Sequence, residues 1–335
     1  MSNEERAGRS GSQGPTVSRR GIIQLAGGAA LATAAVTSLG VGGGPRAAGL
    51  VPPAGRVGDP EGPRFRLVSD SADLLIHDGT PYWWDSPDIW PVPGSDPYGA
   101  PGAPAAGDQA YVWARVTNTG RDDAVGIQVS FYWANPSVQM RYSTINLIGV
   151  SYADIAAGET QDVLCLVPWN VVTVNGGHEC LVVTAQLPGD PPLPDIVDPP
   201  GYPNVAQRNL TLVSRLIKGD FRLTVTANGW QRETKKVQIA WEPGGELPKE
   251  TLASLGLKQT RPASTKATEV RLAADPDGKG ESTLDLVVPA GKSVPFFVTV
   301  HGVTALGPDE YQVVHVIERQ QNQILGGISF VVVAE

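Results

Sequence analysis

The chain has 335 residues, including 39 Gly and 29 Pro, and carries a net charge of −8. Basic residues do not cluster beyond the first twenty positions, which argues against a nucleic-acid binder because phosphate neutralisation needs concentrated positive charge. Hydrophobic residues make up 41% of the chain, enough for packed cores, so a mainly disordered protein is also excluded. Two Cys and four His leave little room for a Cys-rich zinc scaffold.

Two arginines near the N-terminus precede a long uncharged segment. Arg19 and Arg20 lie in the sequence Ser-Arg-Arg-Gly-Ile-Ile-Gln, and the next charged residue is Arg46. This pattern resembles the twin-arginine export signal, with Gln at the position where that family has Lys. The resemblance implies a secreted, periplasmic or cell-envelope protein from which residues 1–48 are removed as the signal peptide. The alternative is a transmembrane anchor, because the segment is long enough to span, but its many Gly and few Leu disfavour a stable anchor.

Removal of the signal changes the charge of the working molecule. Residues 1–48 contain five Arg and two Glu, so the mature chain would have 21 basic and 32 acidic residues and a net charge of −11. Such an acidic surface favours solubility and does not attract nucleic acid or anionic membranes. We therefore expect neither as a partner.

From residue 66 onward, short apolar or alternating segments are separated by clusters of Gly, Pro, Asn and Asp, with no long amphipathic helix. This pattern is typical of all-β sandwiches. After a flexible lead-in at 49–65, we predict two consecutive immunoglobulin-like antiparallel β-sandwich domains, over residues 66–213 and 214–335. The strands expected in the first are 73–77, 109–117, 125–133, 143–147, 160–167, 178–187 and 205–213. Those expected in the second are 221–226, 235–241, 268–272, 283–288, 296–301, 311–318 and 324–333.

Three details follow from the predicted strands. Val112, Ala114 and Val116 should share one face of their strand, because side chains alternate along a strand. Tyr311 has the spacing of a tyrosine corner, whose hydroxyl binds backbone just upstream, and an ordinary turn is the alternative. Residues 328–333 are apolar on both faces, which favours a central strand over an edge that pairs with another chain.

Motifs of the first domain occur in an order that one family shares. A strand ends in Asn-Thr-Gly at 118–120, Ala-Gly-Glu introduces the strand at Thr160, and a Gly-His-led strand from Gly177 is followed by an Asp-Pro loop and an Asn-bearing last strand at 204–209. Together these resemble the bacterial cell-adhesion-related immunoglobulin-like domain, CARDB, over residues 70–213. The resemblance implies an adhesion or spacer module without catalytic residues. The last loop departs from the family pattern because it is rich in Pro.

The two cysteines lie on consecutive predicted strands. Cys165 and Cys180 are joined by a loop of about fifteen residues, and facing positions on an antiparallel pair can bring Cα atoms within bridging range. A bridge over such a loop would stabilise the fold by roughly 3 kcal/mol, and in an exported chain we expect it to form. The alternative is two buried free thiols, because a twin-arginine substrate folds in the reducing cytoplasm.

The segment 82–90 holds three of the eight Trp beside acids and prolines. Tyr82, Trp83, Trp84 and Trp90 are candidate partner-binding residues, because Trp and Tyr are enriched at hot spots and exposed rings beside carboxylates can stack on sugars. The alternative is a loop that folds its indoles over the end of the sandwich in place of missing core.

Metal binding and catalysis find little support. Asp190, Asp195 and Asp198 are weak candidates for calcium, which takes six to eight oxygen ligands, but their spacing does not match an EF-hand and solvated acids are the better interpretation. No His spacing, nucleophile elbow or phosphate loop of a known catalytic type occurs. We therefore predict no cofactor and no enzyme.

The sequence thus predicts an exported, non-enzymatic binding or adhesion module whose partner is a protein or a cell surface. Rigid sandwiches would present two loops, the aromatic segment 82–90 and the Pro-rich loop 191–203. The competing hypothesis is an accessory or self-assembling subunit of an envelope complex, associating through strand edges. A metal-dependent enzyme is the third.

Overall fold

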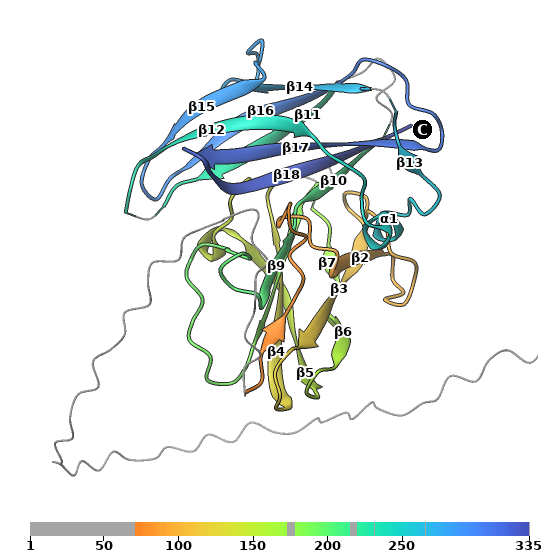
Figure 1. Ribbon diagram of the computed structural model, residues 1–335, viewed down its shortest axis with the longest axis vertical. Coiled ribbons are helices and arrows are strands. Elements are labelled where there is room, and N and C mark those ends of the chain that lie inside the picture. Colours follow the sequence, from red (N-terminus) through yellow and green to blue (C-terminus); the bar gives the residue numbers. More distant parts are fainter. Residues whose placement is uncertain (1–70, 173–177, 215–219, 231, 265, 335) are drawn as a thin grey trace, which may run out of the picture. The chain divides into compact units, whose positions relative to one another are not determined.

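The computed structural model describes residues 71–172, 178–214, 220–230, 232–264 and 266–334 (Figure 1). The predicted export signal and lead-in lie outside the described residues. The described chain is almost entirely β-structure, with one short α-helix, α1 (Lys249–Ser254), and one 3-10 helix, η1 (Tyr142–Thr144). The predicted all-β sandwich class is confirmed, and its immunoglobulin-like detail stays a prediction.

The first sandwich consists of two sheets that share one core. Along β3, the side chains of Ala110, Val112, Ala114 and Val116 are buried and those between them are not, as the alternation predicts. In one sheet, β3 (Gln109–Asn118) pairs with β1 (Leu74–Leu75), β2 (Ile89–Pro93), β6 (Thr160–Leu164) and β7 (Trp169–Asn170). The other has the order β5 (Asn146–Ile155), β4 (Ala124–Ala134), β8 (Cys180–Gln186), β9 (Val205–Arg208).

Two motifs that carry the family resemblance contact each other. The Asn118 N–H donates to the Glu159 carbonyl (2.9 Å), and the Gly158 N–H donates to the Asn118 carbonyl (3.0 Å). The buried Asn118 side chain accepts a hydrogen bond from the Gly120 N–H (3.1 Å), while Gly158 has a φ of +75°, which favours glycine. Turn geometry therefore accounts for both motifs.

The second sandwich also has two sheets around one core, which includes Ile239, Phe296 and Phe330. The larger sheet has the order β10 (Leu210–Ser214), β18 (Gln323–Val333), β17 (Glu310–Gln320), β12 (Lys235–Pro243), β15 (Thr283–Val288), with β13 (Arg261–Pro262) paired to β17. The smaller sheet has the order β11 (Asp220–Asn228), β16 (Ser293–Gly302), β14 (Thr268–Ala273).

The strand expected at 205–213 is two strands that belong to different sandwiches. β9 pairs with β8, whereas β10 pairs in parallel with β18. Between them, the buried Asn209 side chain donates to the carbonyls of Ser137 and Gly327, both at 2.6 Å. The strand pairing therefore changes sandwich at Asn209, a few residues before the boundary expected at 213.

Near the C-terminus, one expectation is confirmed and one is wrong. β18 lies between β10 and β17, so the apolar run 328–333 is a central strand. The Tyr311 hydroxyl does not bind backbone just upstream. Instead it accepts a hydrogen bond from the distant Leu247 N–H (3.0 Å), in the connection between β12 and α1. The predicted tyrosine corner is replaced by a bond to this connection, and Leu247 of the connection, Leu252 of α1 and Leu255 just after it pack around Tyr311.

The two sandwiches belong to one compact unit. The connection after β4 pairs with β11, because the Val138 N–H donates to the Thr226 carbonyl (3.1 Å) and the Thr226 N–H donates to the Pro136 carbonyl (2.9 Å). Glycines on β18 allow this close approach. A Cβ at Gly326 would collide with the Val138 carbonyl, and one at Gly327 would lie 2.6 Å from the Trp84 ring.

Candidate functional site

Trp84, one of the predicted partner-binding residues, belongs to the packed junction between the sandwiches. Its side chain is fully buried, its ring lies against Gly327, and its Nε1–H donates to Ser329 Oγ (3.0 Å). A partner cannot reach a ring in this position. The prediction that Trp84 binds a partner is therefore wrong, and the alternative, indoles folded over the end of the sandwich, is correct for this residue.

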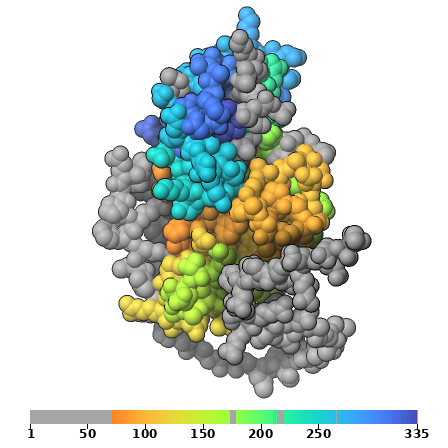
Figure 2. Space-filling view, turned by 90° about the vertical axis from the view of Figure 1, so that its right-hand side faces the viewer, coloured from red at the N-terminus to blue at the C-terminus, as the bar shows by residue number. Residues whose placement is uncertain are grey.

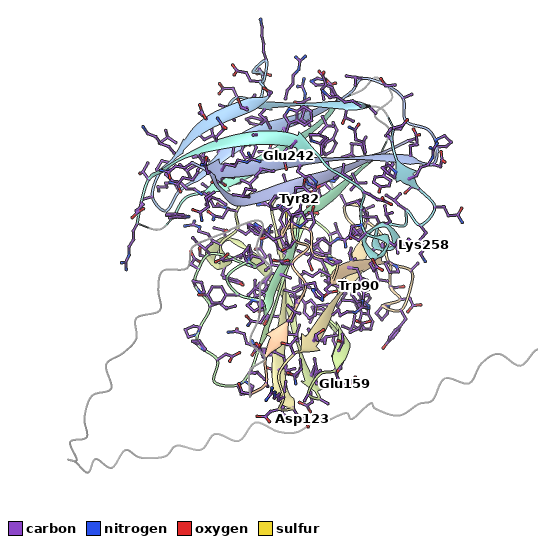
Figure 3. The ribbon with its side chains drawn as sticks, in the orientation of Figure 1. Tyr82, Trp90, Asp123, Glu159, Glu242 and Lys258 are labelled. Atoms are coloured by element: carbon purple, nitrogen blue, oxygen red, sulfur yellow. The ribbon has the colours of Figure 1, made fainter. Side chains whose placement is uncertain are left out.

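Trp90 lies on a strand and not in a loop. It belongs to β2, and its ring is parallel to that of Trp113 on β3, with centroids 6.3 Å apart. Arg115 lies over the Trp90 ring (5.5 Å) and forms an ion pair with Asp162 (2.8 Å). Trp90 is thus a half-buried member of an aromatic row on the outer face of a sheet, away from Tyr82 (Figure 3).

Trp83 lines a hollow of about 600 Å³, which we call the aromatic groove. The two loops expected to present binding residues meet here, since Trp83 comes from the aromatic segment and Tyr202 from the Pro-rich loop. The second sandwich adds Trp230, which no local signal in the sequence singled out. The lining residues are Trp83, Gln139, Pro194, Asp195, Ile196, Val197, Asp198, Tyr202, Trp230, Arg232, Glu233, Gln323 and Leu325.

The Pro-rich wall of the groove is fixed by its own acids. Asp195 accepts hydrogen bonds from the Ser143 N–H (2.8 Å) and hydroxyl (3.0 Å), and Asp198 accepts one from the Gly201 N–H (3.3 Å). Asp190 likewise accepts the Leu187 N–H (2.7 Å). These carboxylates hold the loop in place. No group of three His, Cys, Asp or Glu that could hold a metal ion occurs among the described residues.

A buried ion pair supports the opposite wall. Lys235 Nζ lies 2.5 Å from Glu318 Oε1 and donates to Gln139 Oε1 (2.9 Å), and both charged side chains are almost fully buried. Lys235 also lies 6.0 Å from the centroid of the Trp230 ring. Burial raises the pKa of the Glu318 carboxyl, and the ammonium group of Lys235 opposes that rise. This cluster connects Gln139 of the first sandwich to Trp230 of the second.

A second polar cluster lies at Trp84. Ser329 Oγ hydrogen bonds with Asp85 Oδ2, with His315 Nδ1 (2.6 Å) and with Trp84 Nε1 (3.0 Å). Burial raises the pKa of Asp85 to about 8, although Ser329 and Arg208 oppose the rise, and burial lowers the pKa of His315 to about 4. Both pKa shifts favour the neutral forms of the Asp85 carboxyl and the His315 imidazole.

The number of hydrogen bonds that the Ser329 hydroxyl can donate and accept determines the direction of each bond in this cluster. A hydroxyl offers one hydrogen and two lone pairs, and Trp84 already occupies one lone pair. Either Asp85 or His315 must therefore donate to Ser329 while the other accepts from it. A protonated Asp85 that donates to Ser329, which then donates to His315, satisfies the count and agrees with both pKa directions.

The same cluster contains serine, histidine and aspartate, but in an order that does not activate a nucleophile. In an acyl-transfer triad the histidine lies between the serine and the carboxylate, which orients the imidazole. Here the serine lies between Asp85 and His315, and all three side chains are buried. The arrangement is suited to joining the sandwiches and not to attacking a substrate.

The expected disulfide is not formed. Cys165 and Cys180 are both free and buried. The Cys165 N–H donates to Val112 on β3 (2.9 Å), whereas Cys180 pairs with Ala134 on β4, so the cysteines belong to opposite sheets of the first sandwich. The predicted disulfide is wrong because strands that follow each other in the sequence need not be neighbours in one sheet.

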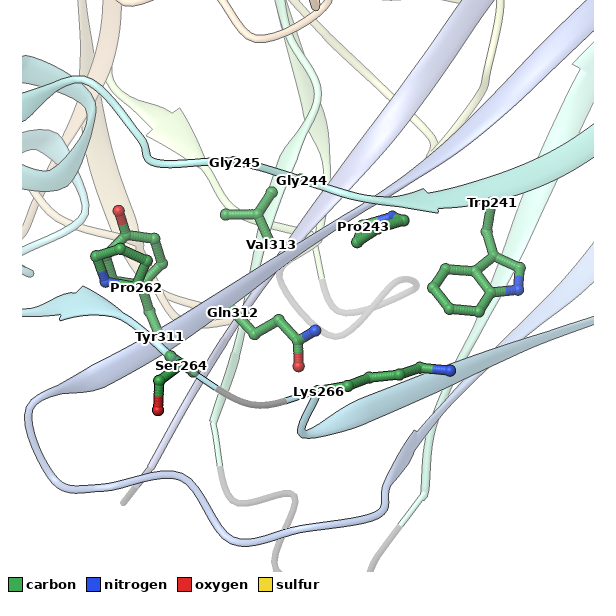
Figure 4. Close-up of a pocket in the computed structure, with 11 residues that line it drawn as sticks. Trp241, Pro243, Gly244, Gly245, Pro262, Ser264, Lys266, Tyr311, Gln312 and Val313 are labelled. Atoms are coloured by element: carbon green, nitrogen blue, oxygen red, sulfur yellow. The ribbon is translucent and has the colours of Figure 1, made fainter.

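Another hollow, of about 430 Å³, lies on the second sandwich beside β12 and β17 (Figure 4). Trp241, Gln312 and Lys266 line it, and Lys266 Nζ lies 5.1 Å from the centroid of the Trp241 ring. Neither predicted loop contributes to this hollow. The structure therefore favours the aromatic groove as the candidate site for the function that the sequence predicts.

No family model and no curated protein matches this chain. Solved structures similar to it include a β-glucosidase involved in saponin metabolism from intestinal bacteria, at 18% identity over 29% of this chain and 14% of that chain (TM-score 0.19). Red sea bream transglutaminase is 9% identical over 81% and 32% (TM-score 0.20), and the CupB6 tip adhesin from Pseudomonas aeruginosa is 8% identical over 80% and 98% (TM-score 0.18). The chain thus spans less than a third of the first two, and likenesses this distant assign no function.

None of the helices in the described part of the chain is both long enough and apolar enough to cross a membrane.

Proposed function

We propose that the chain is an exported, non-enzymatic binding module that captures a protein on a cell surface or in the extracytoplasmic space at the aromatic groove. The single observation that carries the proposal is the meeting of Trp83, Tyr202 and Trp230, from three separate segments, around a hollow of about 600 Å³. That volume lies within the usual range of ligand sites, and Trp and Tyr are the commonest anchors of protein interfaces.

The residues that line the groove favour a partner surface that has both an apolar side chain and polar groups. Arg232 and Glu233 are exposed residues of the lining, whereas Ile196, Val197 and Leu325 supply apolar surface. An apolar anchor of a partner would fill the floor, while flanking polar groups meet the two charges. A binding energy concentrated in a few aromatic contacts is typical of such interfaces.

Export and adhesion belong to the same proposal. The twin-arginine pattern at Arg19 and Arg20 supports an extracytoplasmic location, and the CARDB resemblance supports an adhesive role. The competing proposal, self-assembly through strand edges, would give a larger species that grows with concentration in chromatography of the mature chain. A binder that acts alone would give one species near the monomer mass at all concentrations.

The groove is tested by replacing Trp83 and Trp230 together with Ala and measuring retention of the labelled mature chain on isolated cell envelopes. We expect at least a tenfold loss of apparent affinity, because hot-spot aromatics contribute about 2 kcal/mol or more each. Trp113→Ala, on the outer face of β3, is the matched control and should retain binding. Equal loss in the control, or full retention by the double variant at an unchanged melting temperature, would contradict the proposal.

A further inference from the structure

A separate hollow of about 680 Å³ lies between the start of the aromatic segment and the connection that leads into α1. We call it the acidic pocket. Asp78, Asp85 and Glu246 are among its lining residues, and no Lys or Arg is. It shares no lining residue with the aromatic groove. Figure 2 shows the teal surface around α1 next to the orange surface of the first sandwich, the two segments that border this pocket.

The remaining walls are apolar or aromatic. Pro81, Leu247 and Pro248 provide apolar surface, and Tyr82 provides a ring. Tyr82 is held in place because it stacks on His315, with centroids 3.5 Å apart, and because its hydroxyl lies 3.4 Å from Glu242 Oε1. Tyr82 and Glu242 lie next to each other in Figure 3. The pocket therefore combines an aromatic ring with surrounding acidic groups.

Asp85, one of the lining residues, has a buried acceptor that is not used. Its side chain is 8% exposed, and Oδ2 is bound by Ser329. Oδ1 has no hydrogen-bond partner among the described residues. The buried Arg208 lies near Asp85 and opposes the rise of its pKa, but it makes no hydrogen bond to Oδ1, and its Nη1 donates to the Ile89 carbonyl (2.8 Å). A buried carboxyl oxygen without a donor is rare in folded proteins and indicates a missing partner. Asp85 is neutral while the pocket is empty, and a cation that donates to Oδ1 favours its ionised form.

We propose that the acidic pocket binds an organic cation, an ammonium or guanidinium group on an apolar stem, which donates to Asp85 and lies near the Tyr82 ring. The apolar walls suit the stem, Glu246 lies with Asp85 in the lining, and cations are attracted to aromatic faces. The cation comes either from a basic side chain of a partner protein or from a free amine. This site does not depend on the aromatic groove.

The proposal is tested by calorimetric titration of the mature chain with n-pentylammonium and n-butylguanidinium, with n-pentanol as the uncharged counterpart. We expect saturable binding of at least one cation and at least tenfold weaker binding of the alcohol. Binding of the alcohol as tightly as the cations, or no saturable binding of either cation, would overturn the proposal.

Two variants connect binding to the named residues. Asp85→Asn should weaken cation binding at least tenfold. Because that change touches the Ser329 cluster, the exposed Glu246→Gln is the second variant, and about threefold weaker binding is expected from it at an unchanged melting temperature. Glu233→Gln, in the aromatic groove, is the matched control and should bind as the wild type. Wild-type binding by both pocket variants would refute the assignment.

The source of the cation is distinguished by two further probes. N-acetyl-lysine methylamide carries the amine on a peptide unit, and cadaverine carries it free. Tighter binding of the peptide analogue supports a partner protein's side chain, whereas tighter binding of cadaverine supports a small amine. Failure of both to compete with n-pentylammonium would overturn the assignment of this pocket to either source.

Discussion

The aromatic groove and the acidic pocket both include residues of one short segment, yet they differ in charge and in aromatic content. Trp83 lines the groove, Tyr82 and Asp85 line the pocket, and Trp84 between them is buried in the junction. The groove is lined by Arg232 as well as by acids and carries two Trp and a Tyr, whereas the pocket is lined by acids without Lys or Arg and carries one Tyr and two His. Four consecutive residues therefore serve two sites and one packed core.

The two sites differ because the buried Trp84 separates the residues on either side of it. Trp84 is held by Gly327 and Ser329 of β18, and this contact directs its neighbours toward different hollows. Each hollow then has its own buried support. The groove has Lys235 with Glu318, and the pocket has Asp85 with His315. The following changes test this separation, beginning with the largest expected effect.

Trp84→Ala should lower the free energy of unfolding by about 3–5 kcal/mol, because it leaves a large cavity in a packed junction. Trp83→Ala removes the neighbouring indole from a half-buried position and should cost about 1 kcal/mol or less. Urea denaturation of both variants measures the two values. Similar losses for the two would show that the segment is not divided as the structure indicates.

Lys235→Met should lower the free energy of unfolding by about 3 kcal/mol or more, because it leaves Glu318 buried without its partner. The double variant Lys235→Met with Glu318→Leu should recover most of that loss, since no charge stays buried. Binding at the groove should weaken in the single variant, whereas cation binding in the acidic pocket should not. A single variant as stable as the wild type would show that the ion pair supports neither wall.

Stability should depend on pH through the cluster at the acidic pocket. The folded-state pKa of His315, about 4, lies below its ordinary 6.5, so the unfolded chain takes up the proton first and stability is lost as pH falls from 6.5 to 4. The loss should approach about 3 kcal/mol, and His315→Gln should remove it. For Asp85 the sign is reversed, because a folded-state pKa raised to about 8 gives stability that is lost as pH rises from 3.8 to 8.

Asp85→Asn should therefore flatten the alkaline side of the stability curve, and His315→Gln the acid side. Denaturant midpoints at a series of pH values would show this. Retention of the full acid dependence by His315→Gln would place its origin elsewhere in the chain.

Tyr82→Phe should have the smallest effect, within about 0.5 kcal/mol, because the hydroxyl makes only a long contact of 3.4 Å to Glu242 and the ring stacking on His315 is kept. Thermal unfolding measures it. A loss well above that value would mean that the hydroxyl, and not the ring, fixes the wall of the acidic pocket.

Much of the fold could be predicted because strand alternation and turn residues are local signals. β3, with its buried Val112 and Val116, and the central β18 follow directly from them. β2 was missed because Pro91 and Pro93 lower strand propensity, although an edge position tolerates them. α1 was missed because six residues are too few for a helical periodicity to show.

The candidate site could be predicted only in part. The sequence identified both loops of the aromatic groove, but it gave no reason to select Trp230 or Gln139, which are far from either loop in the chain. It also grouped Trp84 and Trp90 with Trp83 because all three are aromatic and close in sequence. Their burial depends on contacts with β18 and β3, and no local pattern encodes those contacts.

The large content of Gly and Pro, the alternating segments and the acidic charge determined by themselves an all-β chain with little attraction for polyanions. Only the tertiary structure decided which aromatic residues are accessible, that the cysteines lie on opposite sheets, and that the strand at 205–213 divides between two sandwiches. The physical reason is that alternation and turn propensity act over a few residues. Sheet order depends on pairings across tens of positions, as between Gln128 and Gln186, and the contact between sandwiches on pairings across more than two hundred, as between Trp84 and Ser329.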